Sequence, residues 1–346
     1  MATAYTREQE PVDVIKAPSR IGVVGAGAWG TALAQTLRSA GRDVLIWAHG
    51  AATAREITNK HINSIFLPGL PLDPGLTATN RIADLAGCDL ILMVTPAQHM
   101  RAVAASMKGI VAAGTPVVIC CKGIEQSTGK LMSAVLADML PQVVPVVLSG
   151  PSFAHDVASG LPCAVTVACV DATLGAHLAN TLGHKLFRPY WTSDLVGVQL
   201  GGAVKNVLAI AAGIVDGRGM GASAHAALVT RGFSELVRFG RAHGAQPETL
   251  MGLSGLGDLL LTCGSRQSRN MTLGRALGQG KLLPEIQAGQ RTVAEGVFTA
   301  AAVARIAEAE GIDMPVCQAV HAVVSRAITV DEAIDMLLSR PFRAEI

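Results

Sequence analysis

Aromatic side chains, charged side chains and runs of like charge are all scarce in this chain of 346 residues. Aromatic residues make up 3% and charged residues 16%, with a formal net charge of only +2. Neither a basic run nor a stripe of aromatic residues and arginines occurs, which argues against a dedicated nucleic-acid-binding protein. Because 50% of the residues are hydrophobic, the chain can bury a sizeable core, and disorder is excluded.

Long apolar runs are also missing, although the mean hydropathy is high, at +0.41. The longest uncharged stretches, 21–37 and 139–155, are interrupted by four glycines and three prolines respectively. Both are shorter than the about 20 residues of a membrane-spanning helix, so we expect no such helix. Residues 1–19 are polar and lack the apolar segment of a signal peptide. We expect them to form a flexible tail on a cytoplasmic protein.

Metal-ligand spacing is absent as well. The seven cysteines form no pair with the spacing of a metal site, and the nine histidines form no HxH or HxxxH cluster. We expect these cysteines to be reduced, mostly buried thiols in a cytosolic protein. We therefore expect no bound metal.

Short apolar runs alternate with helical patterns through the first half of the chain. Strand-like runs occupy residues 21–24, 44–47, 90–94, 117–121 and 144–148. Helical patterns occupy residues 29–40, 97–111 and 128–139. Continuously apolar strands separated by helices are typical of a parallel sheet that is covered on both faces. Two further strand-like runs, 163–170 and 186–191, are expected to extend the same sheet.

The character of the sequence changes after about residue 192. Strand signals vanish, and alanine-rich amphipathic stretches are separated by glycine-rich breaks at 216–221 and 252–257. The chain is therefore expected to be an α/β domain with a doubly wound sheet over residues 20–192. An all-helical domain is expected over residues 193–346.

A glycine-rich loop follows the first strand. Gly25-Ala26-Gly27-Ala28-Trp29-Gly30 matches G-x-G-x-x-G and opens the first helix, a context that predicts a dinucleotide-binding loop of Rossmann type. Gly25 permits a tight turn, Gly27 lets the backbone approach a pyrophosphate, and Gly30 permits close packing. The pyrophosphate is expected to meet the free N–H groups at the helix N-terminus.

The end of the second strand carries the signal for the type of dinucleotide. NAD-specific sites commonly place a carboxylate there, to accept a hydrogen bond from the ribose 2′-hydroxyl. This chain instead has His49, with Arg55 nearby. Both side chains are compatible with a 2′-phosphate, so we predict that NADP(H) is accepted at least as well as NAD(H).

Lys205 is the only charged residue in an apolar, small-residue segment, 197–210. If it is buried, its pKa falls and the side chain becomes usable as a general acid or base near neutral pH. If instead its ammonium reaches the surface along an apolar stem, it has no such role. The sequence leaves both interpretations open.

Two polar groups further along the chain are also ambiguous. Asp258 and Thr262 are four residues apart and share a helix face, although Asp258 alone is also typical of a helix start. Ser268-Arg269-Asn270 precedes another helix, where an arginine, an amide and a helix N-terminus together suit a phosphate. A solvated polar linker is the competing interpretation.

The combination of motifs resembles the NAD(P)-dependent glycerol-3-phosphate dehydrogenases of bacteria. GAGAWG, CCKGIE, SGPSFA, GVQLGGAVKNV, GLGDLLLTC, QSRN and VAEG occur in family order, and the resemblance covers about residues 20–340. Ala28 and Asp156 are small departures from the usual serine and glutamate. The resemblance implies reversible, NAD(P)H-dependent reduction of dihydroxyacetone phosphate to sn-glycerol 3-phosphate, which supplies phospholipid synthesis.

The resemblance also implies roles for individual residues. Lys205 is the expected proton donor and acceptor, and Lys122 and Asp258 complete the catalytic set. Substrate contacts are implied at Lys122, Gly150, Ser152, Lys205, Asn206, Asp258, Thr262, Ser268, Arg269 and Asn270. Cofactor contacts are implied at Gly25, Gly27, Ala28, Trp29, Gly30, His49, Lys122, Ala154, Arg269, Val293 and Glu295. The partners expected are small molecules and, through the alanine-rich helices, a second copy of the chain in a homodimer.

Two alternatives remain open from the sequence. Other two-domain β-hydroxyacid dehydrogenases and ketopantoate reductase also join a Rossmann domain to helices that carry a lysine, but they take a carboxylate substrate. A catalytically silent nucleotide-sensing module would bind NADPH without turnover.

The interpretation of His49 predicts a change of cofactor preference. His49→Asp places a carboxylate where it accepts from a ribose 2′-hydroxyl and repels a 2′-phosphate. We expect the ratio of kcat/KM for NADPH to that for NADH to fall in this variant. An unchanged ratio would remove His49 from cofactor selection.

Overall fold

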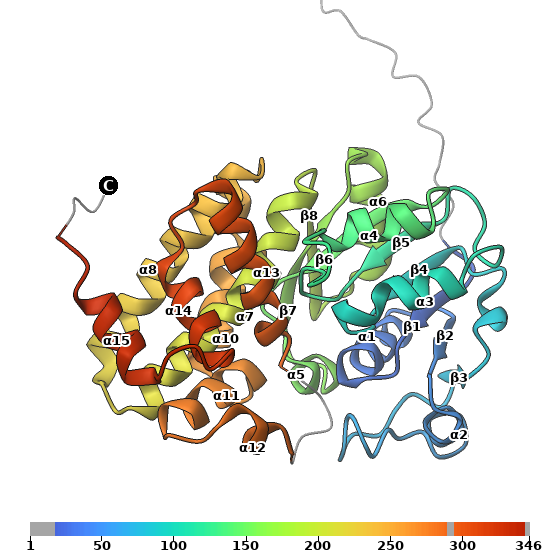
Figure 1. The fold of residues 1–346 in the computed structure, drawn as a ribbon. Helices are drawn as coiled ribbons and strands as arrows, with labels where there is room; N and C mark the ends of the chain where they lie inside the picture. Colours follow the sequence, from blue (N-terminus) through green and yellow to red (C-terminus); the bar gives the residue numbers. More distant parts are fainter. Residues whose placement is uncertain (1–17, 289–293, 343–346) are drawn as a thin grey trace, which may run out of the picture.

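The computed structural model describes residues 18–288 and 294–342, which form an α/β part and a helical part lying side by side (Figure 1). The α/β part is a sheet with helices on both faces, and the chain leaves it between Thr192 and Leu195. No strand occurs after that point in the residues described. The predicted fold class is confirmed.

The sheet has eight strands in the order β3-β2-β1-β4-β5-β6-β7-β8. Their bounds are β1 Ile21–Val24, β2 Val44–Trp47, β3 Thr77–Thr79, β4 Leu90–Met93, β5 Pro116–Ile119, β6 Val144–Ser149, β7 Cys163–Ala168 and β8 Phe187–Thr192. All neighbouring strands are parallel except β6 and β7, which are antiparallel. The carboxyl ends of β1, β4, β5 and β6 therefore lie at one edge of the sheet, and the order of strands reverses beside β1, where such folds bind ligands.

Both faces of the sheet are buried, which explains the continuously apolar strands. Ile21 and Val23 belong to the apolar cluster beneath α1 (Ala28–Ser39) and α6 (Ala172–Leu182). Val24 belongs to the opposite cluster, beneath α3 (Met100–Ser106) and α4 (Met132–Met139). Successive residues of a strand point to opposite faces, so each face needs its own apolar set.

Several predicted elements differ from the structure. The edge strand β3 was not predicted, because three residues, Thr-Ala-Thr, give no apolar run. The helix expected over 97–111 is a short 3₁₀ turn, η2 (Ala97–His99), followed by α3, which ends at Ser106. The expected glycine break at 252–257 is largely helical, because Leu253–Gly257 forms a π-helical turn, η3, that leads directly into α10 (Asp258–Gly264).

The helical part is built around α7 (Leu195–Gly217), in which residues 197–215 are all buried. Around α7 stand α8 Gly221–Ala242, α9 Pro247–Met251, α10, α11 Arg269–Gly278, α12 Leu283–Ala288, α13 Glu295–Glu310, α14 Pro315–Val324 and α15 Val330–Leu338. A Cβ atom added to Gly213 of α7 or to Gly274 of α11 would collide with the backbone of the other helix. Glycine at both positions therefore lets these helices approach closely.

Helix α7 is also long and apolar enough to cross a membrane by length and composition alone. In its most apolar window, however, 94% of the residues are buried inside the protein. It is thus the core helix of the helical part. Its small residues reflect close packing against neighbouring helices rather than contact with lipid.

Candidate active site

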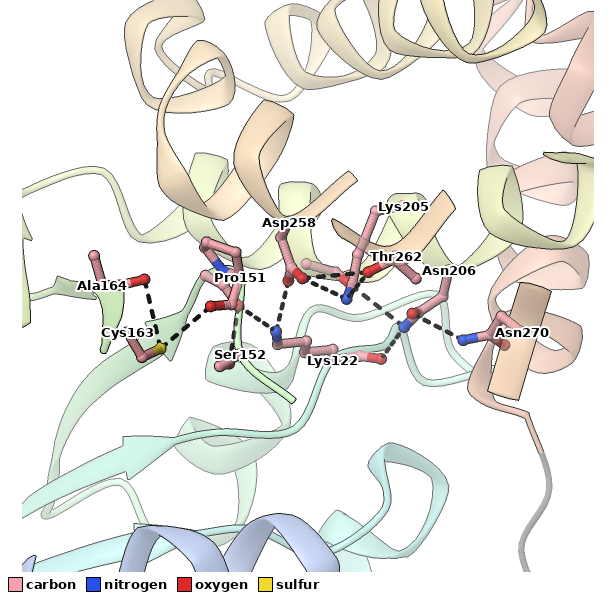
Figure 2. A network of polar contacts seen from close by, with 12 residues as sticks. Lys122, Pro151, Ser152, Cys163, Ala164, Lys205, Asn206, Asp258, Thr262 and Asn270 are labelled. Carbon is pink, nitrogen blue, oxygen red and sulfur yellow. Dashed lines mark hydrogen bonds and ion pairs between the residues drawn. The ribbon is translucent and has the colours of Figure 1, made fainter. Parts of the chain in front are cut away.

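Loops from the sheet and residues of the helical part meet beyond the carboxyl edge of the sheet. Lys122 lies three residues past the end of β5, and Gly150 and Ser152 follow β6. Lys205 and Asn206 come from the middle of α7, and Asp258 and Thr262 come from α10. Figure 2 shows the side chains of Lys122, Lys205, Asn206, Asp258 and Thr262 pointing toward one another.

A single carboxylate joins the two lysines. Asp258 accepts a hydrogen bond from Lys122 Nζ through Oδ2, at 2.5 Å, and one from Lys205 Nζ through Oδ1, at 2.7 Å. Lys205 Nζ also donates to Thr262 Oγ1 at 2.7 Å, and Lys122 Nζ donates to the Gly150 carbonyl at 3.0 Å (Figure 2). The structure thus brings together five residues that the sequence analysis had singled out: Lys122, Gly150, Lys205, Asp258 and Thr262.

Lys205 is buried, which decides between the two interpretations left open by the sequence. Lys205 is 7% exposed and Asp258 is 1% exposed. Burial lowers the pKa of Lys205 to about 8; the charge of Asp258 opposes this shift and that of Lys122 reinforces it. An amine with this pKa exchanges a proton near neutral pH, as a general acid or base must.

The two glycines before Lys205 make this close packing possible. A Cβ atom at Gly202 would lie 2.6 Å from Ser149 Oγ and 3.4 Å from Lys122 Cγ. A Cβ atom at Gly201 would lie 2.6 Å from the carbonyl oxygen of Ser254, in the π-helical turn. Glycine at both positions therefore lets α7 approach the Lys122 loop on one side and the turn before Asp258 on the other.

Asn206 extends the network toward α11 and α13. Its Nδ2 donates to the Lys122 carbonyl at 3.3 Å and to the Gly202 carbonyl at 3.4 Å. Its Oδ1 accepts from Asn270 Nδ2 at 2.9 Å, and Asn270 Oδ1 accepts from the Gly296 N–H at 3.0 Å. These bonds use both donors of Asn206 and one lone pair of its Oδ1, so the second lone pair of Oδ1 is what remains for a ligand hydroxyl.

The segment Ser268-Arg269-Asn270 is a helix start. Ser268 is the N-cap of α11, and its hydroxyl oxygen accepts from Met271 N at 3.2 Å. The proton of that hydroxyl remains available to an anion. Arg269 is the first residue of the helix. Burial raises the pKa of the nearby Glu295, and the charge of Arg269 opposes that shift. A guanidinium, a hydroxyl and the positive end of a helix are a suitable set for a phosphate.

The glycine loop has the geometry of an anion cradle. Gly25 has φ +120°, which favours glycine, and Gly30 leaves no room for a Cβ atom beside the Gly25 carbonyl. In contrast, a Cβ atom at Gly27 would meet nothing within 4 Å. Gly27 is the N-cap of α1, and no side chain caps the helix there. Open space over uncapped N–H groups fits the pyrophosphate of a dinucleotide.

Other expected cofactor residues surround this edge of the sheet. Glu295 Oε1 accepts from the Ala97 N–H at 3.2 Å, whereas its buried Oε2 has no partner among the described residues. Burial raises the pKa of Glu295. The indole N–H of Trp29 is likewise buried and unpaired within the described chain, His49 is exposed just after β2, and Ala154 begins α5 (Ala154–Ala158). Val293 lies outside the described residues.

An ion pair missed by the sequence analysis holds the Lys122 loop. Arg101 of α3 binds both oxygens of Glu125, each at 2.8 Å, and Glu125 also accepts from Thr128 Oγ1. Glu125 is only 5% exposed. The two partners are 24 residues apart on different elements, so no local pattern joins them.

Comparison with known proteins agrees with this geometry. Residues 20–175 match the family described as NAD-dependent glycerol-3-phosphate dehydrogenase N-terminus, and residues 194–335 match the corresponding C-terminus. The chain belongs to this family. The resemblance stated from the motifs is thereby confirmed.

Individual relatives are similar over almost their whole length. The glycerol-3-phosphate dehydrogenase [NAD(P)+] of Parvibaculum lavamentivorans is 56% identical over 94% of this chain and 98% of its own. That of Maricaulis maris is 53% identical over the same shares, 94% and 98%. The crystal structure of glycerol-3-phosphate dehydrogenase from Coxiella burnetii superposes with a TM-score of 0.89 at 38% identity, covering 94% of this chain and 100% of the other.

The shared carboxylate predicts an effect on stability. Asp258→Asn leaves two ammonium groups without their counter-charge, so the free energy of unfolding should fall by about 3–5 kcal/mol, as when one partner of a buried ion pair is removed. Urea unfolding measures the change. Adding Lys205→Met to Asp258→Asn should restore part of the loss.

The matched control is Asp138→Asn. Asp138 also binds two cations, Arg101 and Lys130, but its side chain is 32% exposed. Solvent screens that network, so the variant should lose much less stability. Equal losses in Asp258→Asn and Asp138→Asn would contradict the account of the buried carboxylate.

Proposed function

We propose that the protein reduces dihydroxyacetone phosphate to sn-glycerol 3-phosphate, reversibly, with NADPH or NADH as the hydride donor. The observation that carries the proposal is the buried Lys205–Asp258–Lys122 cluster, beside a helix start suited to phosphate. The printed names of the relatives, glycerol-3-phosphate dehydrogenase [NAD(P)+], support the same activity. The product would supply glycerophospholipid synthesis.

The substrate phosphate is proposed to bind at the start of α11. Arg269 supplies the guanidinium, Ser268 donates its free hydroxyl proton, and Asn270 offers the remaining N–H of its amide. Binding the phosphate away from the reacting carbon fixes the orientation of a small substrate and makes that binding energy available to the reaction. Gly150 and Ser152 are proposed to contact the substrate from the β6 side.

The carbonyl end of the substrate is proposed to lie against the two lysines. Asp258 and Thr262 hold Lys205 in place and, together with Asn206, contact the hydroxyl groups of the substrate. Lys205 donates a proton to the carbonyl oxygen during reduction and accepts it back during oxidation. The ammonium of Lys122 stabilises negative charge that develops on that oxygen before the proton arrives.

The dinucleotide is proposed to bind along the carboxyl edge of β1, β2 and β4. Gly25, Gly27, Ala28, Trp29 and Gly30 form the pyrophosphate cradle, and His49 lies where the second ribose is expected. Residues Lys122, Ala154, Arg269 and Glu295 are proposed to surround the remaining part. When bound, the reduced nicotinamide supplies the hydride for the carbonyl carbon.

The cysteines and the exposed apolar side chains bear on the cell compartment and the oligomeric state of the protein. All seven cysteines are unpaired, five of them buried, which is typical of a cytoplasmic protein. In the helical part, Met336 is 44% exposed and Leu338 is 73% exposed. We propose that the protein works in the cytoplasm as a homodimer joined through this part.

An absorbance assay tests the activity directly. Purified protein should oxidise NADPH or NADH, followed at 340 nm, when dihydroxyacetone phosphate is added. Unphosphorylated dihydroxyacetone should give little turnover, because it cannot use the phosphate site. Turnover of an α-keto carboxylate such as ketopantoate in its place would favour the related carboxylate reductases, and NADPH binding without any turnover would favour a sensing role.

The role of Lys205 gives a second prediction. Lys205→Ala should lower kcat by at least about 100-fold, the scale of general acid–base catalysis, while the Kd for NADPH is retained. Lys281→Ala, at an exposed lysine of the same part, is the control and should leave kcat unchanged. Near-normal turnover of Lys205→Ala would remove that residue from the proton-transfer step.

A further inference from the structure

Asn63 is a fully buried polar residue that no motif had singled out. It lies just after α2 (Ala51–Lys60), in a segment that turns back toward the start of the sheet, and its side chain is 0% exposed. Its Oδ1 accepts from the Phe66 N–H at 3.2 Å, and its carbonyl accepts from the Leu67 N–H at 2.9 Å. The amide group is thus held rigidly within its own turn.

The other end of this amide reaches the glycine loop. Asn63 Nδ2 donates to the Ala26 carbonyl at 2.9 Å and to Thr31 Oγ1 at 2.8 Å. Thr31 Oγ1 lies 3.4 Å from the same Ala26 carbonyl and donates to it. Asn63, which lies 37 positions further along the chain, therefore holds the peptide group that joins Ala26 to Gly27.

The direction of that peptide group matters for an anion. In a trans peptide the C=O and the N–H point in opposite directions, and the described chain contains no cis peptide bond. With the Ala26 carbonyl directed at Asn63, the Gly27 N–H points the other way. A Cβ atom added to Gly27 would meet nothing within 4 Å, so there is open space beside this residue. No oxygen of the described residues accepts a hydrogen bond from this N–H.

We propose that Asn63 is a positioning residue for pyrophosphate binding: by holding the Ala26 carbonyl, it aims the Gly27 N–H at the ligand. This inference rests on the proposed binding of NAD(P)H at the glycine loop. Without the Asn63 bond, the peptide is free to rotate, and the N–H must be reoriented each time the dinucleotide binds. The effect is on affinity for the dinucleotide and not on the reacting groups.

The test compares two ligands that differ in the pyrophosphate. NADPH contains it, whereas adenosine 2′-monophosphate has the adenine and the 2′-phosphate without it. Asn63→Leu removes both donated hydrogen bonds at similar size and without adding charge. By NADPH fluorescence titration, its Kd for NADPH should rise about tenfold, the scale of one or two lost hydrogen bonds to a positioned group. The affinity for adenosine 2′-monophosphate, measured by competition, should stay within about twofold.

Control variants separate positioning from folding. Ser64→Ala removes a neighbouring hydroxyl that bonds only Glu56, so both affinities should match those of the wild type. If Asn63→Leu does not fold, Thr31→Val removes the shared hydroxyl at the same size and should weaken NADPH binding selectively, by a smaller factor. For the folded Asn63→Leu, kcat at saturating NADPH should remain close to that of the wild type.

Two results would overturn the proposal. One is an unchanged Kd for NADPH in Asn63→Leu; the other is an equal loss of affinity for NADPH and adenosine 2′-monophosphate, which indicates a general structural role. Wild-type protein that binds NADPH but does not reduce dihydroxyacetone phosphate would instead contradict the proposed activity and leave the role of Asn63 standing.

Discussion

The carboxylate of Asp258, shared between Lys122 and Lys205, is the interaction on which the rest of the site depends. One negative charge is buried between two ammonium groups that come from the two parts of the protein, Lys122 from the sheet and Lys205 from α7. Removing charged groups from water is costly, and close pairing with full hydrogen bonding is what compensates for it. The packing and the hydrogen bonds around the three side chains hold them close enough for that pairing.

Close backbone packing brings the elements that carry these side chains together. Glycines in α7 let the helix lie against the loop of Lys122 and the π-helical turn before Asp258, and the Glu125–Arg101 pair holds the loop itself. Asn206 then ties the Lys122 carbonyl to Asn270 at the start of α11. A phosphate bound at that helix start would be connected, through two amide side chains, to the backbone of Lys122.

The sequence predicted the architecture well because the relevant signals are local. Continuous apolar runs identified seven of the eight strands, and β1 and β2 have the predicted bounds, since both faces of this sheet are buried. Thr77–Thr79 was missed because it is a short edge strand without an apolar run. The glycine break at 252–257 was expected to be a flexible turn, and its π-helical path depends on packing against α7, which no local pattern encodes.

The candidate site was predictable only in part. The sequence singled out Lys122, Lys205 and Asp258, but it left the burial of Lys205 undecided, because its partner Asp258 lies 53 residues away. Asn63, Glu125 and Arg101 carried no signal, since a single asparagine or ion pair acquires its meaning from a contact that the fold creates. Residues whose role is to hold another group in place therefore cannot be identified from a single sequence.

We propose that burial beside Asp258 sets the proton affinity that Lys205 needs to act as the general acid and base. The most direct test is kcat/KM for dihydroxyacetone phosphate and for glycerol 3-phosphate as a function of pH, with saturating cofactor, because kcat/KM reports the pKa values of the enzyme before the substrate binds. The lowered pKa of about 8 predicts that reduction, which needs the protonated amine, slows as the pH rises through that value. Oxidation, which needs the neutral amine, should accelerate over the same range. Rates that stay flat in both directions between about pH 6.5 and 9.5 would contradict Lys205 as the group that transfers the proton.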